Sequence, residues 1–146
     1  MELKIVVDKN FIMKDFLSDM LTRIRNGQRA GLDAVYLHSH MPKMCKVVLK
    51  LLVEEGYIRG FSEYDSNKLI NNKIKVFLKY KNNGAPVIEG LFRVSTPGRR
   101  IYVSTKILWK PKTNIGLFIF STPQGIMTDR DARLLNLGGE VLCGIY

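Results

Sequence analysis

The spacing of the apolar residues changes from helical to alternating near Tyr57, and this change constrains the fold more than any other feature of the sequence. Before it, residues 15–29 and 42–52 carry apolar side chains three and four positions apart, which predicts two helices with one buried face each. The short apolar segment 34–37 between them is typical of a strand. After Tyr57 the spacing is mainly two residues, as in β-strands. A mixed α/β fold of the α+β kind follows.

The alternation is clearest in residues 73–81, where apolar residues from Ile74 to Tyr80 alternate with lysines and Phe77. Further strands are predicted at residues 57–61, 87–95, 100–104, 115–120 and 140–146. The segment 115–120 lacks alternation, which is typical of a strand buried on both faces.

Turn and cap residues separate these elements. Gly56 predicts a left-handed end to the second helix, and Pro97-Gly98 predicts a type II turn. Thr128 is a typical N-cap and predicts a short helix after it.

An Asn-Asn-Gly-Ala-Pro segment at residues 82–86 is the predicted domain boundary. We therefore expect an N-terminal extension at residues 1–14 and a helix-strand-helix domain with a short sheet at residues 15–81. Residues 82–146 are expected to form a second small domain, mostly an antiparallel sheet with one short helix.

Charge indicates the class of partner. The 146 residues carry a formal net charge of +10, and residues 66–146 hold thirteen of the 23 basic residues against four of the 13 acidic ones. A large positive charge on one half favours an extended polyanion, with nucleic acid first, over a small-molecule substrate. Two cysteines are too few for a disulfide scaffold and indicate a reducing compartment. No apolar run approaches the ~20 residues that span a bilayer, so we expect neither a membrane partner nor a secretory signal.

Catalytic motifs are missing from the sequence. It has no phosphate-binding glycine loop, no Cys-x-x-Cys pair and no Gly-x-Ser-x-Gly elbow. His38 and His40, with Met44 and Cys45 after them, are the one group with metal-binding character, and two loop histidines ahead of a helix explain it more simply. We expect no enzymatic activity and no cofactor.

Three segments are candidates for RNA binding, and each has a simpler explanation. The face with Lys73, Lys75, Phe77, Lys79 and Lys81 suits a phosphate backbone, but an edge strand protected by lysines explains it equally well. The helix face with Arg25, Asn26 and Arg29 could face RNA or water. Residues 121–125, Ser-Thr-Pro-Gln-Gly, follow a buried strand and could bond sugars and base edges, or form a plain turn.

These segments resemble a known family in sequence order. The matching blocks are Asp19-Met20-Leu21-Thr22-Arg23-Ile24-Arg25-Asn26, Glu54-Glu55-Gly56-Tyr57-Ile58, Leu78-Lys79-Tyr80-Lys81, Pro86-Val87-Ile88-Glu89-Gly90-Leu91, Gly125-Ile126-Met127-Thr128-Asp129-Arg130 and Gly138-Gly139-Glu140-Val141-Leu142-Cys143. Together they are similar to the family of protein eight of the small ribosomal subunit, in its bacterial form.

The resemblance implies a two-domain structural protein that binds the central domain of small-subunit ribosomal RNA directly, beside neighbouring small-subunit proteins, and helps assembly. It implies that the C-terminal domain makes most contacts, with residues 121–125 against the RNA minor groove and Glu140 beside them. An RNA-binding translational repressor, or a metal-dependent enzyme acting on RNA outside the ribosome, is the alternative. The expected RNA-binding residues are Ser121, Thr122, Gln124, Gly125, Glu140, Arg99, Arg100, Lys75, Lys79, Lys81, Arg25 and Asn26.

The sequence also departs from the family pattern. Pro123 and Gln124 stand where the family has Ser and Lys, and Thr96 stands where its turn has Arg, with Arg99 nearby. Residues 1–14 extend beyond the usual start, and residues 106–114 diverge. Such drift suits an organellar ribosome, with the mitochondrion favoured over the bacterial cytoplasm.

Overall fold

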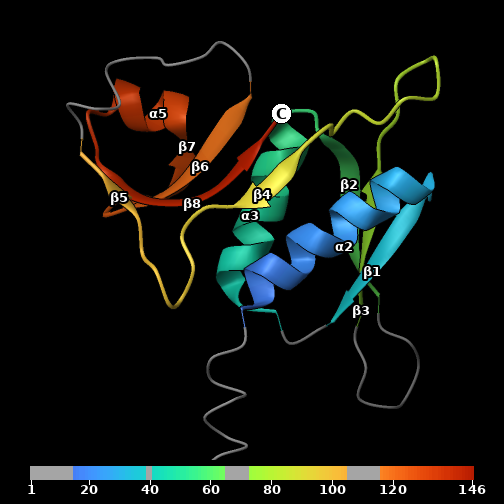
Figure 1. Cartoon of the computed structure of the whole chain (residues 1–146), viewed down its shortest axis with the longest axis horizontal. Coiled ribbons are helices and arrows are strands. Elements are labelled where there is room, and N and C mark those ends of the chain that lie inside the picture. Colours follow the sequence, from blue (N-terminus) through green and yellow to red (C-terminus); the bar gives the residue numbers. More distant parts are fainter. Residues whose placement is uncertain (1–14, 39–40, 65–72, 105–115) are drawn as a thin grey trace, which may run out of the picture.

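In the part of the chain that the structure describes, two helices and three strands come first, and the five strands that follow them form a second sheet (Figure 1). The computed structural model describes residues 15–38, 41–64, 73–104 and 116–146. In chain order the elements are α2 (Phe16–Ala30), β1 (Ala34–His38), α3 (Lys43–Glu54), β2 (Ile58–Tyr64), β3 (Lys73–Leu78), β4 (Leu91–Arg93), β5 (Tyr102–Val103), β6 (Leu117–Thr122), β7 (Gly125–Thr128), α5 (Asp129–Leu134) and β8 (Gly139–Ile145). This mixture of helices and antiparallel strands confirms the predicted fold class.

The two long predicted helices form, as does the short one after Thr128, and local chemistry sets the ends of the long ones. Asp15 caps α2 by accepting a hydrogen bond from the Ser18 backbone N–H at 3.3 Å, and Gly31 ends that helix with φ +71°. Pro42 occupies the N-cap position of α3, where its missing N–H costs nothing. Gly56 follows α3 with φ +78°, which confirms the left-handed stop.

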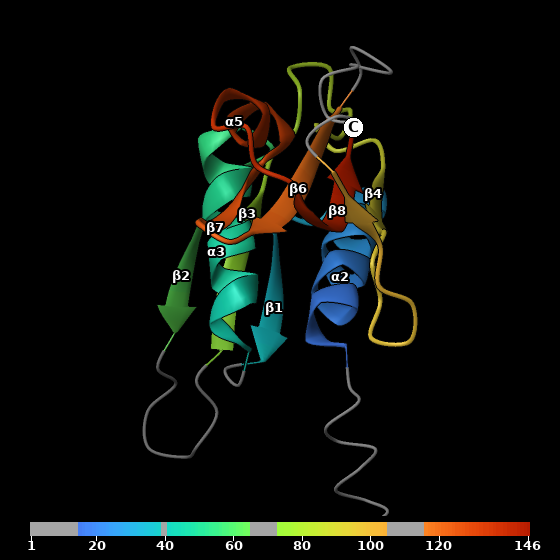
Figure 2. The same cartoon turned by 90° about the vertical axis from the view of Figure 1, so that its left-hand side faces the viewer.

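The first sheet has the order β1-β3-β2, with antiparallel neighbours. Its helix-facing side buries Val35, Ile74 and Val76 beneath α2 and α3, as Figure 2 shows for α3. β3 is the middle strand, so the explanation of its lysines as protection for a sheet edge is wrong. The strand ends at Leu78, and Lys79 and Lys81 therefore lie beyond it.

The second sheet has the order β4-β8-β6-β7, and β5 also pairs with β8. On one of its faces α5 covers Phe120, Met127 and Val141. β4 and β5 are shorter than predicted, and β7 was not predicted at all. The expectation that residues 115–120 are buried on both faces is also wrong in part, because Phe118 is exposed.

The turn at Pro97-Gly98 forms, but it is not type II. Thr96 and Arg99 exchange backbone hydrogen bonds of 3.0 and 3.1 Å across it. A type II turn needs a positive φ at Gly98, and the glycines with positive φ in the described chain do not include it.

The largest hydrophobic core runs through both sheets. It includes Leu52 of α3 and Val76 of β3 together with Leu117 of β6 and Ile145 of β8. The connection between the sheets is fixed by Gln28, a buried α2 residue whose amide donates to the Lys79 carbonyl at 3.3 Å and accepts from the Ile88 N–H at 3.4 Å. The predicted boundary at residues 82–86 lies in this connection.

Some expectations concern residues outside the described ones. They are the extension 1–14, the divergent segment 106–114, and Ser39 with His40. Within the described residues, no helix has the length and apolar character required to cross a bilayer.

Candidate RNA-binding surface

A row of residues crosses one end of the second sheet. By register, Tyr102 of β5 lies opposite Glu140 of β8, which lies opposite Ser121 of β6, and Ser121 lies opposite Ile126 of β7. Residues directly opposite in a sheet share a face, and α5 packs on the other face. Tyr102 is 70% exposed, Glu140 and Ser121 are half-buried, and Ile126 packs against the main core. The row therefore offers an aromatic ring, a carboxylate and a hydroxyl on one surface.

Within this row, hydrogen bonds fix the position of the Glu140 carboxylate. Its Oε1 accepts from the Ser95 hydroxyl at 2.6 Å and from the Arg100 guanidinium at 2.9 Å. The fully buried Ser95 hydroxyl also accepts from the Ile101 N–H at 3.1 Å, so its orientation is fixed. Partial burial raises the pKa of Glu140, but the bonds from Ser95 and Arg100 outweigh burial and leave that pKa below its usual value. Glu140 is thus an ionised acceptor of fixed orientation.

The loop beside Glu140 is a two-residue hairpin turn, Pro123-Gln124, between β6 and β7. The proline ring holds φ near −65°, which excludes the primed turns usual in two-residue hairpins. Gly125, which follows the turn, compensates for the unusual turn type with φ +118°. Other residues adopt this conformation with strain. Pro123, Gln124 and Gly125 are exposed.

The structure corrects the expected placement of Thr122. Its side chain is buried, its hydroxyl donates to the Gly125 carbonyl at 2.7 Å, and the same oxygen accepts from the Gln124 N–H at 3.3 Å. Thr122 therefore holds the hairpin turn, whereas Ser121 and Gln124 offer the accessible polar groups.

Basic groups lie next to this surface on the turn at residues 96–100. Arg99 and Arg100 are exposed, and the Arg100 contact with Glu140 joins the turn to β8. The surface thus combines Ser121, Gln124, Gly125, Glu140, Arg99 and Arg100 with Thr122 behind them.

Tyr102 is a residue of this surface that sequence reasoning missed. β5 is two residues long, and the partner that places it is Glu140, far along the chain. The predicted strand at residues 100–104 was the available signal, because in a strand Tyr102 lies on the opposite face from Ile101 and Val103.

Arg25 does not face solvent or RNA as expected. Its guanidinium donates to the Leu91 carbonyl of β4 at 3.0 Å, and its Nε is buried without a hydrogen-bond partner among the described residues. Arg25 therefore joins α2 to the second sheet. Asn26 and Arg29, by contrast, are exposed.

The expected lysines do not form one track with the C-terminal surface. Lys75 lies on the open face of the first sheet, where its ammonium is 5.7 Å from the Tyr36 ring centroid and 5.1 Å from that of Phe77. Lys79 is exposed, and Lys81 pairs with Glu89 at 3.1 Å. The side chain of Lys73 is outside the described part.

Comparison with known proteins gives a single family. The family model for Ribosomal protein S8 matches residues 15–146. The chain belongs to this family. Its relatives include the small ribosomal subunit protein uS8 of Orientia tsutsugamushi (strain Ikeda), 42% identical over 92% of this chain and 98% of the relative. The same proteins of Rhodospirillum centenum and Erythrobacter litoralis are 45% and 47% identical over the same shares.

Membership in the Ribosomal protein S8 family makes the chain a ribosomal protein with a structural, non-enzymatic role. It confirms the predicted bacterial-type family and the location at the ribosome.

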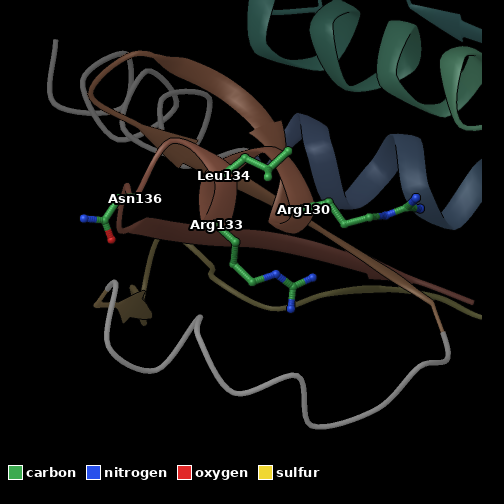
Figure 3. A pocket seen from close by; sticks show the side chains of 4 residues that line it. All are labelled: Arg130, Arg133, Leu134 and Asn136. Carbon is green, nitrogen blue, oxygen red and sulfur yellow. The ribbon is translucent and has the colours of Figure 1, made fainter.

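An open hollow lies beside α5. Arg130, Arg133, Leu134 and Asn136 line an open space of ≈ 550 Å³ (Figure 3). Figure 3 shows the polar ends of Arg130, Arg133 and Asn136 pointing in different directions. Arg130 pairs with Glu55, and Arg133 pairs with Asp129. The described residues also contain no group of three His, Cys, Asp or Glu able to hold a metal ion, and the side chains of His38 and His40 lie outside them.

Proposed function

We propose that the chain binds the central domain of small-subunit ribosomal RNA directly through its C-terminal surface and helps the subunit to assemble. That surface consists of Ser121, Gln124, Gly125, Tyr102, Glu140, Arg99 and Arg100. Its partners in this role are the RNA and neighbouring small-subunit proteins.

The observation that carries the proposal is an ionised Glu140 held in place beside Ser121. A carboxylate near a polyanion is repelled by phosphates, so it is favourable only where it accepts bonds from sugar hydroxyls or base amino groups. Ser95 and Arg100 fix the position of the Glu140 carboxylate. It can therefore accept a hydrogen bond only from an RNA that places a donor group at that point. Arg99 supplies attraction to phosphates that does not depend on sequence.

The proposal also assigns separate roles to the changed turn residues. Pro123 has no N–H to offer, and Gln124 offers a neutral amide where a lysine would add a charge. We therefore infer that the loop contributes less to affinity than the loop of typical family members, and the basic residues contribute more.

Binding of a central-domain RNA fragment and of an unrelated duplex, each at several salt concentrations, tests these roles. Ser121→Ala should lower the preference for the fragment about 2- to 10-fold, as loss of one neutral hydrogen bond does, with the salt slope unchanged. Glu140→Gln should lower the preference further and leave duplex binding equal or tighter, because a repelling charge is removed.

Arg99→Ala is the matched electrostatic variant. It should weaken binding of both RNAs and reduce the slope of log K against log salt by a little under about one. If Arg99→Ala lost the preference for the fragment and Ser121→Ala changed the salt slope, then Arg99 would supply the specificity and Ser121 the electrostatic attraction, the reverse of the roles proposed. Equal binding by all variants would place the RNA site elsewhere.

The source compartment is a separate proposal. We infer an organellar ribosome, with the mitochondrion first, from the drift at Pro123, Gln124 and Thr96. Fractionation of cells that express a tagged chain, followed by detection in mitochondrial or cytoplasmic small subunits, distinguishes the two.

A further inference from the structure

The open face of the first sheet carries two aromatic rings. Lys75, on the middle strand, lies opposite Tyr36 of β1 and Ser62 of β2, and Phe77 lies opposite Ala34 and Gly60. These positions alternate with the buried Val35 and Val76, so they share the face that the helices leave uncovered. Tyr36 is 50% exposed.

Small neighbours leave the Phe77 ring accessible. Its cross-strand partners are an alanine and a glycine, and a Cβ added at Gly60 would meet no heavy atom within 4 Å. The Phe77 ring is partly exposed, and no side chain at Ala34 or Gly60 is large enough to cover it.

Positively charged side chains lie close to both rings. The Lys75 ammonium lies 5.7 Å from the Tyr36 ring centroid and 5.1 Å from that of Phe77. The Arg59 guanidinium lies 5.9 Å from the Phe77 centroid, and the Arg59 Nε donates to the Leu78 carbonyl at 2.8 Å, which fixes the side chain. None of the described residues at the register positions of this face is acidic; they are Ala34, Tyr36, His38, Gly60, Ser62, Tyr64, Lys73, Lys75 and Phe77.

We propose that this face binds unpaired RNA nucleotides, with Tyr36 and Phe77 stacking on bases and Lys75 and Arg59 neutralising the adjoining phosphates. Exposed rings on a sheet, interleaved with cations, are the arrangement that recognises single-stranded RNA. A duplex hides the faces of its bases, so only unpaired nucleotides can use the rings. Stacking on a base contributes more than an exposed cation–π contact, so an arriving base displaces the ammonium of Lys75 toward phosphate.

This surface is separate from the one assigned above. It belongs to the first sheet and shares no residue with the group around Glu140, so either can fail without the other. It gives Lys75 a role as part of a stacking site rather than of a lysine track.

The test uses the full chain and a fluorescein-labelled octauridylate, with a labelled duplex as comparison, followed by fluorescence anisotropy. Tyr36→Thr removes a ring and keeps strand propensity, and Tyr36→Phe keeps the ring. Tyr36→Thr should weaken octauridylate binding about 5- to 50-fold, the range for one lost stacking contact, and leave duplex binding within about twofold. Tyr36→Phe should bind both RNAs within about twofold of the unchanged chain.

Two further variants separate the contributions. Lys75→Gln should reduce the salt slope for the single strand by about 0.7. Thr22→Ala, at an exposed position of α2 that belongs to neither surface, should leave octauridylate binding unchanged.

Binding by Tyr36→Thr equal to that of the unchanged chain would overturn the proposal, and so would equal losses for duplex and single strand. If the variants fail to fold, an octamer containing 4-thiouridine is crosslinked to the unchanged chain. Crosslinks to peptides of β1 and β3 support the proposal, and crosslinks to the C-terminal half alone overturn it. Crosslinking of this face only to another protein in assembled subunits would also overturn it.

Discussion

The guanidinium groups of Arg25 and Arg93 form bonds within the fold. Arg93 pairs with Asp15 at 3.2 Å and donates to the Leu142 carbonyl at 2.6 Å, with 9% of its side chain exposed. Arg25 donates to the Leu91 carbonyl at 3.0 Å. Both connect α2, or its cap, to the second sheet. The net charge of +10 therefore includes arginines whose guanidinium groups are already bonded inside the protein.

Arg25→Ala should lower the free energy of unfolding by about 1–3 kcal/mol, because the Leu91 carbonyl loses its guanidinium donor. Arg29→Ala, one turn later on the same helix and exposed, should change it by less than about 0.5 kcal/mol. Urea denaturation of both variants checks this difference. A larger loss in Arg29→Ala would show that the Arg25 contact with the Leu91 carbonyl does not contribute to stability as expected.

Asp15 should make stability depend on pH. Its partial burial raises its pKa, but bonds from Ser18 and the nearby Arg93 outweigh burial and leave the pKa below the usual 3.8. A carboxyl whose folded-state pKa is depressed stabilises the fold fully above its unfolded pKa, and that contribution disappears as the pH falls through the folded pKa. Asp15→Asn, which keeps a capping side chain, should therefore be less stable than the unchanged chain at pH 7.

Thermal unfolding of both chains between pH 7 and pH 2 measures this difference. It should shrink below about pH 4 and vanish once Asp15 is protonated in the folded state. A difference that stays constant over the whole range would assign the effect to packing rather than to charge.

The roles of these residues were not predictable from local sequence. Arg25 lies on the polar side of a helical pattern, and its partner is a backbone carbonyl that carries no signal in the amino-acid sequence. Thr122 likewise looked like a free hydroxyl, although Gly125 at the end of the turn was a sign that the loop bends sharply back on it. Ser121 and Glu140 were expected near one another from the family resemblance, and the register of β6 and β8 places them opposite each other. The contact of Arg100 with Glu140 was not predicted.

At the scale of elements, predictability followed the length and periodicity of the pattern. The two long helices were predicted within a few residues, because α2 and α3 each repeat their apolar spacing over several turns, and Asp15 and Pro42 mark where they begin. β7 was missed because it is four residues long and begins with glycine, so it looked like part of a loop. Sheet order is also absent from local sequence, and this is why β3 could not be distinguished from an edge strand.

At the scale of the whole molecule, the two sheets share their main core. Leu52 of α3 is fully buried in the same cluster as Ile145 of β8. The buried Gln28 amide holds the segment that connects the sheets. We therefore expect the two halves to unfold together, even though each has its own sheet.

Leu52→Ala tests this coupling. It should lower the free energy of unfolding by about 2–5 kcal/mol, as truncation of a buried leucine does. Native-state hydrogen exchange should show the loss at amides of β8 as well as of β3. Reduced protection confined to β3 would instead show two independently unfolding domains.

The position of β8 in chain order has a consequence for biosynthesis. It pairs with β4, β5 and β6, all of which are made before it, and it carries Glu140. A nascent chain in which β8 has not yet been released cannot complete the second sheet. It also lacks the Glu140 carboxylate of the candidate RNA surface. On the proposed function, RNA binding through this surface therefore begins only after translation has passed that strand. A stalled or truncated product without it lacks the Glu140 surface and cannot compete with the finished protein for the RNA bound there.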